Sequence, residues 1–209
     1  MNIAYNVDCM EYMRTLPDKA FDLAVVDPPY GINVSNNMGR RKGQRASNYK
    51  KVTWDEAPPP AEYFEQLRRV SRDQIIFGAN HFVSLIPNAN SPCWICWDKN
   101  FSENVSFASF ELAWTSFDSP CKRVKISPAK EQNGRIHPTQ KPVALYAWIF
   151  ARYAKPGDKI LDTHLGSGSS RIAAYDAGLD FVGCEIDKDY FAAQEERFAA
   201  HTAQLSLFV

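Results

Sequence analysis

A short apolar run ends in four residues whose types could bind and activate an amine. The run extends from Leu23 to Val26, and Asp27-Pro28-Pro29-Tyr30 follows it directly. A short apolar run that ends at a turn signal is typical of a buried strand of a parallel sheet, and the two prolines stop it by removing two backbone donors. Open parallel sheets bind ligands beyond the carboxyl ends of their strands, so the sequence predicts that these four residues line a site.

The chemistry of these residues suits a planar ring that carries an exocyclic amine. The Asp27 carboxylate and the proline carbonyls can accept the two N–H groups of such an amine, and the Tyr30 ring can stack on the planar ring. A simple surface turn after a strand is the alternative explanation of the same four residues. Residues elsewhere in the chain must therefore decide between the two.

A second candidate site follows another predicted strand, Ile160-Leu161. Residues 162–170 include Gly166 and Gly168 and open a helix. Glycines let the backbone approach a ligand closely, and a helix N-terminus offers unpaired N–H groups. Glu185 ends the next strand, about 20 residues beyond the loop, where an acid can bind two ribose hydroxyls. One of the three glycines of a dinucleotide fingerprint is missing, so a smaller adenosine ligand fits better; a Glu that merely ends a strand is the alternative.

The elements that must position these two sites alternate between strands and helices. We expect strands near residues 1–5, 22–26, 74–78, 93–97, 160–161 and 181–184, a hairpin within 107–117, and helices near 10–16, 58–70 and 142–153. This alternation predicts an α/β protein with a mostly parallel sheet, an antiparallel hairpin strand and helices on both faces. The 209 residues are enough for one domain with a substantial core.

The composition is that of an ordinary globular protein, with 45% hydrophobic and 23% charged residues. No apolar run is long enough to span a bilayer, and residues 1–8 lack the features of a signal peptide. The odd number of cysteines, five, favours reduced thiols and a cytoplasmic location. Strand alternation would send Cys93 and Cys96 to opposite faces, and no second cysteine pair could complete a zinc site, so no metal is expected.

The formal net charge is zero, but the charges are unevenly distributed. Residues 31–54 hold six basic residues and no acid, residues 119–141 hold six basic residues and one acid, and the rest holds 12 basic against 23 acidic residues. A basic face on an acidic body suits a phosphate backbone, whereas a solvated loop is the alternative for either segment alone. The candidate phosphate contacts are Arg40, Arg41, Lys42, Arg45, Lys50, Lys51, Lys122, Arg123 and Lys125.

Four motifs resemble those of the DNA amino-methyltransferases, which methylate adenine N6 or cytosine N4 with S-adenosylmethionine. Residues 27–30 resemble the catalytic motif of the family, 161–170 its cofactor loop, 137–142 the segment before that loop, and 8–10 the acid at the cofactor adenine. The chain departs from the loop pattern at Thr163 and His164, where the family usually has Pro and Phe. The resemblance covers about residues 1–30 and 137–200.

The resemblance implies a Rossmann-like methyltransferase fold in one domain over residues 1–209, with DNA-contacting segments 31–56 and 98–136. The catalytic motif precedes the cofactor loop, as in the permuted beta class. The implied cofactor is S-adenosylmethionine and the implied partner is DNA, while a homodimer and an accompanying restriction endonuclease stay open. The resemblance assigns catalysis to Asp27, Pro28, Pro29 and Tyr30. It assigns cofactor binding to Asp8, Cys9, Asp27, Thr139, Lys141, Pro142, Asp162, His164, Gly166, Gly168, Ser169, Glu185 and Ile186.

The implied activity is methyl transfer to N6 of a flipped-out adenine by a site-specific DNA-methyltransferase. Related enzymes that modify a protein glutamine carry Asn in place of Asp27, and cytosine-N4 enzymes often carry Ser there, so adenine is favoured. Methylation of cytosine N4 or of an RNA base remains an alternative, as does a nucleic-acid-binding module that has lost catalysis.

Overall fold

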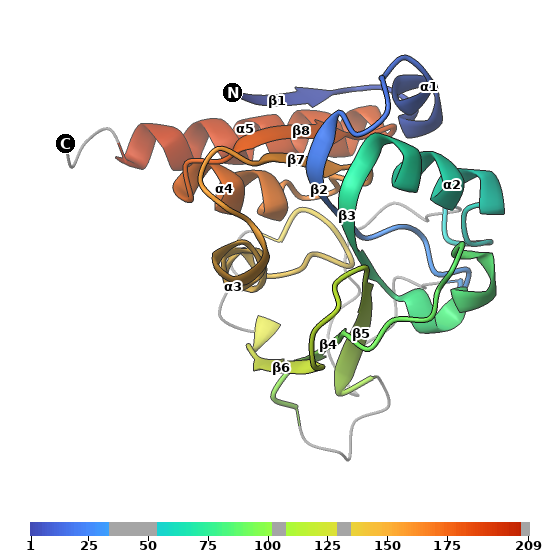
Figure 1. Ribbon diagram of the computed structural model, residues 1–209. Coiled ribbons are helices and arrows are strands. Elements are labelled where there is room, and N and C mark those ends of the chain that lie inside the picture. Colours follow the sequence, from blue (N-terminus) through green and yellow to red (C-terminus); the bar gives the residue numbers. More distant parts are fainter. Residues whose placement is uncertain (34–53, 102–107, 129–134, 206–209) are drawn as a thin grey trace.

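The computed structural model describes residues 1–33, 54–101, 108–128 and 135–205 (Figure 1). In this part of the chain, eight strands form one sheet in the order β1-β8-β7-β2-β3-β5-β4-β6. Their bounds are β1 Asn2–Tyr5, β2 Phe21–Val26, β3 Ser71–Phe77, β4 Trp94–Asp98, β5 Phe110–Thr115, β6 Lys122–Lys125, β7 Lys159–Asp162 and β8 Asp180–Cys184. The helices are α1 Cys9–Arg14, α2 Ala61–Val70, α3 Val143–Tyr153, α4 Ser169–Asp176 and α5 Lys188–Leu205, with short 3₁₀ helices at Ala79–His81 and Val83–Leu85.

The sheet is mostly parallel, as the sequence predicts. Strands β1, β8, β7, β2 and β3 pair in parallel, β5 is antiparallel to both of its neighbours, and β6 is parallel to β4. The antiparallel hairpin differs from the expectation, because β5 pairs with β4 rather than with a second strand inside 107–117. Strand β6 was not predicted, since it is only four residues long and buries one side chain, that of Val124.

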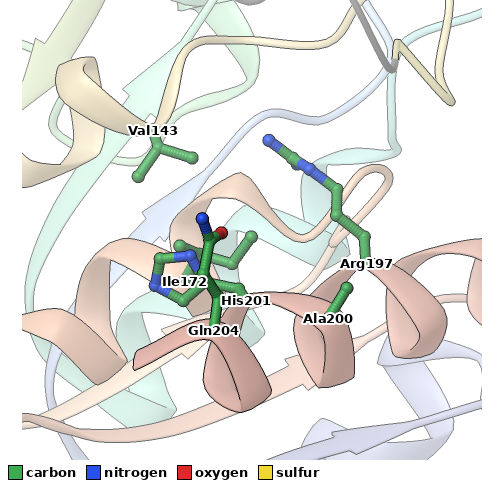
Figure 2. Close-up of a pocket in the computed structure, with 6 residues that line it drawn as sticks. All are labelled: Val143, Ile172, Arg197, Ala200, His201 and Gln204. Atoms are coloured by element: carbon green, nitrogen blue, oxygen red, sulfur yellow. The ribbon is translucent and has the colours of Figure 1, made fainter. Parts of the chain in front are cut away.

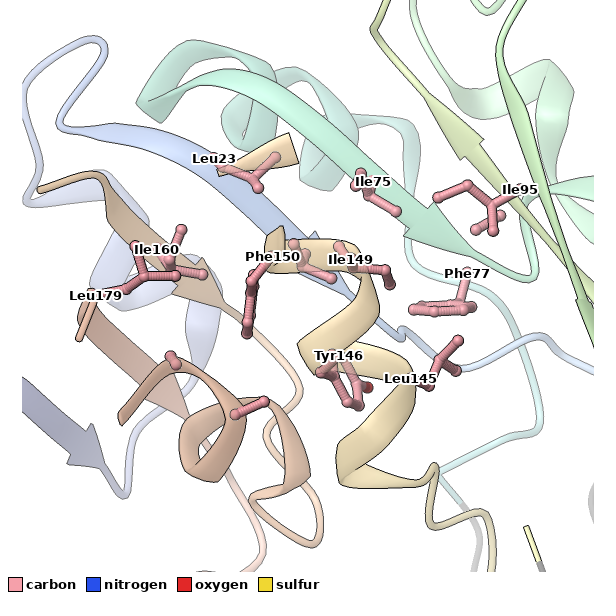
Figure 3. Close-up of a cluster of buried hydrophobic side chains, with 14 of the residues drawn as sticks. Leu23, Ile75, Phe77, Ile95, Leu145, Tyr146, Ile149, Phe150, Ile160 and Leu179 are labelled. Carbon is pink, nitrogen blue, oxygen red and sulfur yellow. The ribbon is translucent and has the colours of Figure 1, made fainter. Parts of the chain in front are cut away.

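Helices cover both faces of the sheet, and strand alternation sends apolar side chains to each. Leu23 and Val25 of β2 belong to the cluster that packs against α3 and α4 (Figure 3). Ala24 and Val26 of the same strand belong to the cluster on the opposite face, against α1 and α2. A strand buried on both faces reads as a continuous apolar run, which is the pattern that residues 23–26 show.

The strand order reverses between β7 and β2, and this reversal places the two candidate sites side by side. From β7 the chain continues to β8 on one side, whereas β2 leads to β3 on the other. Leu161 pairs with Ala24 in parallel strands, so Asp162 at the end of β7 and Asp27 after β2 both lie at the carboxyl ends of these neighbouring strands. Ligands of doubly wound sheets bind at such a crevice. No described helix combines the length and the apolarity needed to cross a bilayer.

Candidate active site

Asp27 is held by two partners directly after the end of β2. Its Oδ1 accepts a hydrogen bond of 2.7 Å from the Tyr30 hydroxyl, and its Oδ2 forms an ion pair of 2.5 Å with Lys141 Nζ. The Lys141 side chain is 4% exposed and the Asp27 side chain 16%. Pro28 is buried and Pro29 half-buried between Asp27 and Tyr30. The turn therefore presents a fixed carboxylate at the sheet edge, in contrast to a solvated surface turn.

Two residues that sequence analysis did not single out extend this cluster. Glu111 of β5 places Oε2 3.2 Å from Lys141 Nζ and 3.2 Å from the Tyr30 hydroxyl. Lys99, just after β4, binds the other oxygen of Glu111 at 2.6 Å. The signal for Glu111 was present in the sequence, because a lone acid within the apolar stretch 107–117 needs a partner when it is buried.

Burial and charge shift the cluster's carboxyl groups in opposite directions. Burial raises the pKa of Asp27, the nearby Glu111 carboxylate adds to that rise, and the Lys141 ammonium opposes it. Burial also acts to raise the pKa of Glu111, but Lys141 and Lys99 outweigh it and lower the pKa to about 2. The pKa of Lys141 is raised, because Asp27 and Glu111 outweigh the effect of burial, so Lys141 is charged. The two carboxylates therefore balance the two ammonium groups of Lys141 and Lys99.

Tyr30 is fixed through both its backbone and its ring. The backbone N–H groups of Tyr30 and Gly31 donate to Asp55 Oδ1 at 2.7 and 2.9 Å. The ring stacks on His81 with centroids 5.3 Å apart, so His81 serves as a packing residue. Gly78 lies under the ring with a φ of +68°, and a Cβ added there would be 2.1 Å from Tyr30 Cε1. Only glycine leaves room for the ring at this point.

The glycine loop follows β7 and leads into α4, as predicted. Gly166 and Gly168 have φ values of +51° and +73°. Gly166 N–H donates to Glu185 Oε2 at 2.8 Å, and Asp187 N–H donates to Glu185 Oε1 at 2.8 Å. Burial raises the pKa of Glu185 while these backbone donors oppose the rise. Glu185 thus joins the end of β8 to the loop after β7.

Asp162 connects the beginning and the end of this loop. It accepts hydrogen bonds from the His164 backbone N–H at 3.0 Å and from the Ser170 hydroxyl at 2.5 Å. Burial raises the pKa of Asp162 to about 7. Ser169, also buried, lies 3.1 Å from the Ser167 hydroxyl and accepts a 2.9 Å hydrogen bond from Arg197. These contacts fix the loop from inside the protein.

The two residues that depart from the family pattern bind each other and α2. Thr163 Oγ1 lies 2.6 Å from the Tyr63 hydroxyl and 3.0 Å from His164 Nδ1. Burial lowers the pKa of His164 to about 4, so the imidazole is neutral at pH 7. A hydrogen-bonded chain therefore replaces the apolar packing that Pro and Phe would supply.

Residues 137–142 lie across the loop and the catalytic turn. The His137 ring would be 3.7 Å from a Cβ added to Gly166. It stacks on the Trp54 ring, with centroids 5.5 Å apart, and meets the Tyr190 ring edge-on at 4.4 Å. Thr139 Oγ1 is 3.1 Å from His137 Nδ1. Lys141 contacts Asp27, so the structure links this predicted cofactor residue to the catalytic turn. Pro142 is buried and precedes the first residue of α3.

The remaining predicted cofactor residues lie at the ends of β1 and β8. Asp8 caps α1 by accepting from Met10 N–H at 2.7 Å and Glu11 N–H at 3.1 Å, so it has a structural role whatever else it binds. Burial raises the pKa of the Cys9 thiol to about 12, so this thiol is not a nucleophile at pH 7. Ile186 follows Glu185 and is 66% exposed, which is unusual for a large apolar side chain.

A family comparison adds an independent observation to this geometry. Residues 94–196 match the family model N6_N4_Mtase, described as DNA methylase. The type II methyltransferase M2.MboI of Moraxella bovis is 24% identical over 237 residues, which cover 93% of this chain and 86% of that protein. The resemblance to the DNA amino-methyltransferases is confirmed. YubD of Escherichia coli (strain K12) is 26% identical over 205 residues, covering 92% of this chain and 88% of that protein.

Solved methyltransferase structures share the fold. The crystal structure of an M1.HpyAVI–SAM complex matches with a TM-score of 0.62 and 21% identity over 94% of this chain and 98% of that chain. The cytosine-N4-specific PvuII DNA methyltransferase matches with a TM-score of 0.65 and 13% identity over 95% of this chain and 86% of that chain. The expected Rossmann-like methyltransferase fold is therefore confirmed.

The structure describes only some of the predicted phosphate contacts. Lys122, Arg123 and Lys125 lie on the edge strand β6, where Arg123 pairs with Asp98 at 2.5 Å. The other predicted phosphate contacts lie outside the described residues: Arg40, Arg41, Lys42, Arg45, Lys50 and Lys51.

A pocket of about 400 Å³ lies between the start of α3 and helices α4 and α5 (Figure 2). Its lining contains none of the predicted site residues and consists of Val143, Ile172, Arg197, Ala200, His201 and Gln204. In the described ranges, no three His, Cys, Asp or Glu side chains are grouped so that they could hold a metal ion.

Proposed function

We propose that this protein is a site-specific DNA methyltransferase that transfers a methyl group from S-adenosylmethionine to N6 of a flipped-out adenine. One observation carries the proposal: the anchored Asp27 carboxylate lies at the strand-order reversal, beside a glycine loop that is tied to an acid. This arrangement puts an acceptor for an amine next to a place for an adenosine-like cofactor.

The residues around the glycine loop fit S-adenosylmethionine. Glu185 is 9% exposed at the end of β8, where a carboxylate can bind ribose hydroxyls. Ile186 next to it offers an exposed apolar surface to a purine ring. The positive φ values of Gly166 and Gly168 let the loop backbone turn tightly before α4. The cofactor would supply an electrophilic methyl group attached to sulfur.

The residues of the catalytic turn would position the target amine. The amine of adenine is a poor nucleophile because its lone pair is shared with the ring. Asp27 and the Pro28 carbonyl would accept its hydrogens, which favours a tetrahedral nitrogen whose lone pair faces the methyl group. Tyr30 would stack on the extruded base, since an exocyclic amine in a duplex is reached only by flipping.

Methylation of cytosine N4 is the second candidate. The cytosine-N4-specific PvuII enzyme shares the fold over 95% of this chain, and cytosine carries an exocyclic amine that Asp27 could bind equally well. The carboxylate at position 27 favours adenine, because cytosine-N4 enzymes of the family often carry Ser there.

Product analysis tests the proposal and separates the candidates. Unmethylated genomic DNA, treated with the protein and labelled cofactor and then digested to nucleosides, should contain N6-methyldeoxyadenosine. N4-methyldeoxycytidine would move the assignment to the second candidate. Methylation of RNA treated in parallel, without methylation of the DNA, would exclude DNA as the substrate. Protein that binds the cofactor but transfers no methyl group to any nucleic acid would overturn the proposed function.

Glu185→Gln should weaken the binding of S-adenosylmethionine at least about tenfold. The substitution removes a charge-assisted hydrogen bond, worth roughly 1.5–3 kcal/mol, while the amide oxygen can still accept one of the two backbone N–H groups that Glu185 binds, those of Gly166 and Asp187. Isothermal titration calorimetry measures the effect. Asp180→Asn is the matched control. Asp180 is the first residue of β8, at the opposite end of the strand from Glu185, so this variant should bind the cofactor with unchanged affinity. Equal affinities of the two variants would refute the role of Glu185.

We also propose that residues 1–209 act as one catalytic domain, with segments 31–56 and 98–136 in contact with DNA. Replacing Arg40, Arg41 and Lys42 by Ala should weaken DNA binding and reduce its salt dependence, by about 0.9 in the logarithmic slope for each lost phosphate contact. Fluorescence anisotropy over a salt series measures the slope, and cofactor affinity should stay constant. Replacement of Lys155, an exposed lysine shortly before β7, provides a single-substitution control. A slope equal to that of the wild type would mean that residues 31–54 form a solvated insertion and do not contact DNA phosphates.

A further inference from the structure

The charge cluster around Asp27 reaches beyond the catalytic motif to two strands of the antiparallel part of the sheet. Glu111 comes from β5 and Lys99 follows β4, and both side chains are mostly buried, with 21% and 15% exposed. Lys141 lies between the two carboxylates, 2.5 Å from Asp27 and 3.2 Å from Glu111. The four groups thus form a continuous chain of ion pairs: Asp27, Lys141, Glu111 and Lys99.

We propose that Glu111 and Lys99 are positioning residues that act through Lys141 to set the charge and the orientation of the Asp27 carboxylate. This inference rests on the proposed function, because it assigns to Asp27 the task of accepting the amine. Lys141 would neutralise Asp27 fully if it had no other partner, and a fully neutralised carboxylate is a weak acceptor. Glu111 shares the Lys141 ammonium, so the Asp27 carboxylate is less strongly paired and stays a more basic, stronger acceptor, while Lys99 prevents a net negative cluster.

The geometry distinguishes this arrangement from an ordinary structural ion pair. Each oxygen of Glu111 has a different partner, since Oε1 binds Lys99 and Oε2 faces both Lys141 and the Tyr30 hydroxyl. Lys141 Nζ also donates to the Tyr30 hydroxyl at 3.1 Å and lies 4.8 Å from the Phe77 ring centroid. A lysine held from several sides cannot turn toward solvent, so its charge stays divided between the two carboxylates.

The other groups that face Asp27 also bear on its charge. The Tyr30 hydroxyl donates to Asp27 from the catalytic turn. Burial raises the pKa of Asp162 at the end of β7 and that of Tyr146 of α3, and the nearby Asp27 carboxylate adds to both rises. These groups are unchanged in variants of Glu111 and Lys99, so a shift in such variants reports on the ion-pair chain itself.

Two substitutions of opposite sign test the inference through the pH dependence of single-turnover methyl transfer. Glu111→Gln removes a negative neighbour, so Asp27 should lose its proton more easily and the acid limb should move down by about 1 pH unit. Lys99→Met leaves a surplus negative charge, so the acid limb should move up by about 1 unit. Lys99→Arg should keep the wild-type limb, and Lys155→Met controls for the loss of a lysine in general.

A second measurement keeps the test valid if a variant is inactive. In protein labelled with ¹³C at the Asp carboxyl carbons, the titration of Asp27 should shift in the same two directions, and calorimetry should show retained cofactor binding. The inference would be overturned if the acid limbs of both variants stayed at the wild-type pH or moved in the same direction. The proposed function would still stand in that case, provided that the wild-type protein methylates DNA. Wild-type protein without methyl transfer would instead refute the proposed function.

Discussion

Asp27→Asn is expected to lower the single-turnover rate of methyl transfer by roughly 10²- to 10³-fold, the range found when one preorganised polar group at a reacting centre is removed. The amide keeps the size of the side chain, but its NH₂ group cannot accept a hydrogen from the amine. Affinity for the cofactor should fall much less than the rate, because the described contacts of Asp27 run to Lys141 and Tyr30. The interaction is therefore needed chiefly as the nitrogen changes geometry.

The control for this prediction lies on the same strand. Asp22 near the start of β2 accepts from Lys159 N–H at 3.0 Å and is at the opposite edge of the sheet, so Asp22→Asn should keep full activity. Thermal unfolding of both variants separates activity from stability. Glu111 still pairs with Lys141 in Asp27→Asn, so the loss of unfolding free energy should stay below the roughly 3–5 kcal/mol of an unpaired buried charge. An Asp27→Asn protein that methylates at near wild-type rate would contradict the mechanism.

Local patterns were enough to predict the parallel part of the fold. The apolar run 23–26 and its two prolines identify β2 and the end of it, and the glycines between β7 and α4 identify the loop. These signals lie within a few residues of each other, and each has a direct physical cause in backbone burial or φ. The register that brings Asp27 beside Asp162 then follows from the parallel order of the sheet.

Contacts between distant segments could not be predicted in the same way. The resemblance implies a cofactor contact for Lys141, and the structure adds ion pairs with Asp27, 114 positions earlier in the chain, and with Glu111 of β5. Such a pairing depends on β5 lying beside β3, which no local pattern encodes. The Tyr30 hydroxyl shows the same limit: the sequence predicts a stacking ring, whereas the structure adds a hydrogen bond to Asp27.

The departures from the family pattern can be explained only with the structure. Thr163 and His164 look unsuited to a loop that usually carries Pro and Phe. Tyr63 from α2 compensates, because its hydroxyl lies 2.6 Å from Thr163 Oγ1 and its ring contacts the His164 ring edge-on at 5.4 Å. A buried polar group is tolerated when it is hydrogen-bonded, so this chain keeps the loop by other means.

Gly78→Ala is expected to reduce methyl transfer by roughly 5- to 150-fold, the equivalent of the 1–3 kcal/mol that stacking of a base on an aromatic ring contributes. A Cβ at position 78 would be 2.1 Å from Tyr30 Cε1 and 2.4 Å from Cζ, so the ring must leave its place on His81. The Tyr30 hydroxyl would then also leave Asp27 Oδ1. One methyl group thus disturbs the stacking surface and the orientation of the catalytic carboxylate together.

Gly178→Ala provides a closely matched control, because Gly178 has a φ of +67° against +68° for Gly78 and no heavy atom within 4 Å of an added Cβ. Both variants place alanine in a left-handed conformation, so both should lose about 1–2 kcal/mol of stability from backbone strain. Only Gly78→Ala should lose activity beyond that. Single-turnover methyl transfer beside thermal unfolding measures the two effects. Equal activities at equal loss of stability would mean that the position of the Tyr30 ring does not matter for the reaction, and the stacking role of Tyr30 would have to be abandoned.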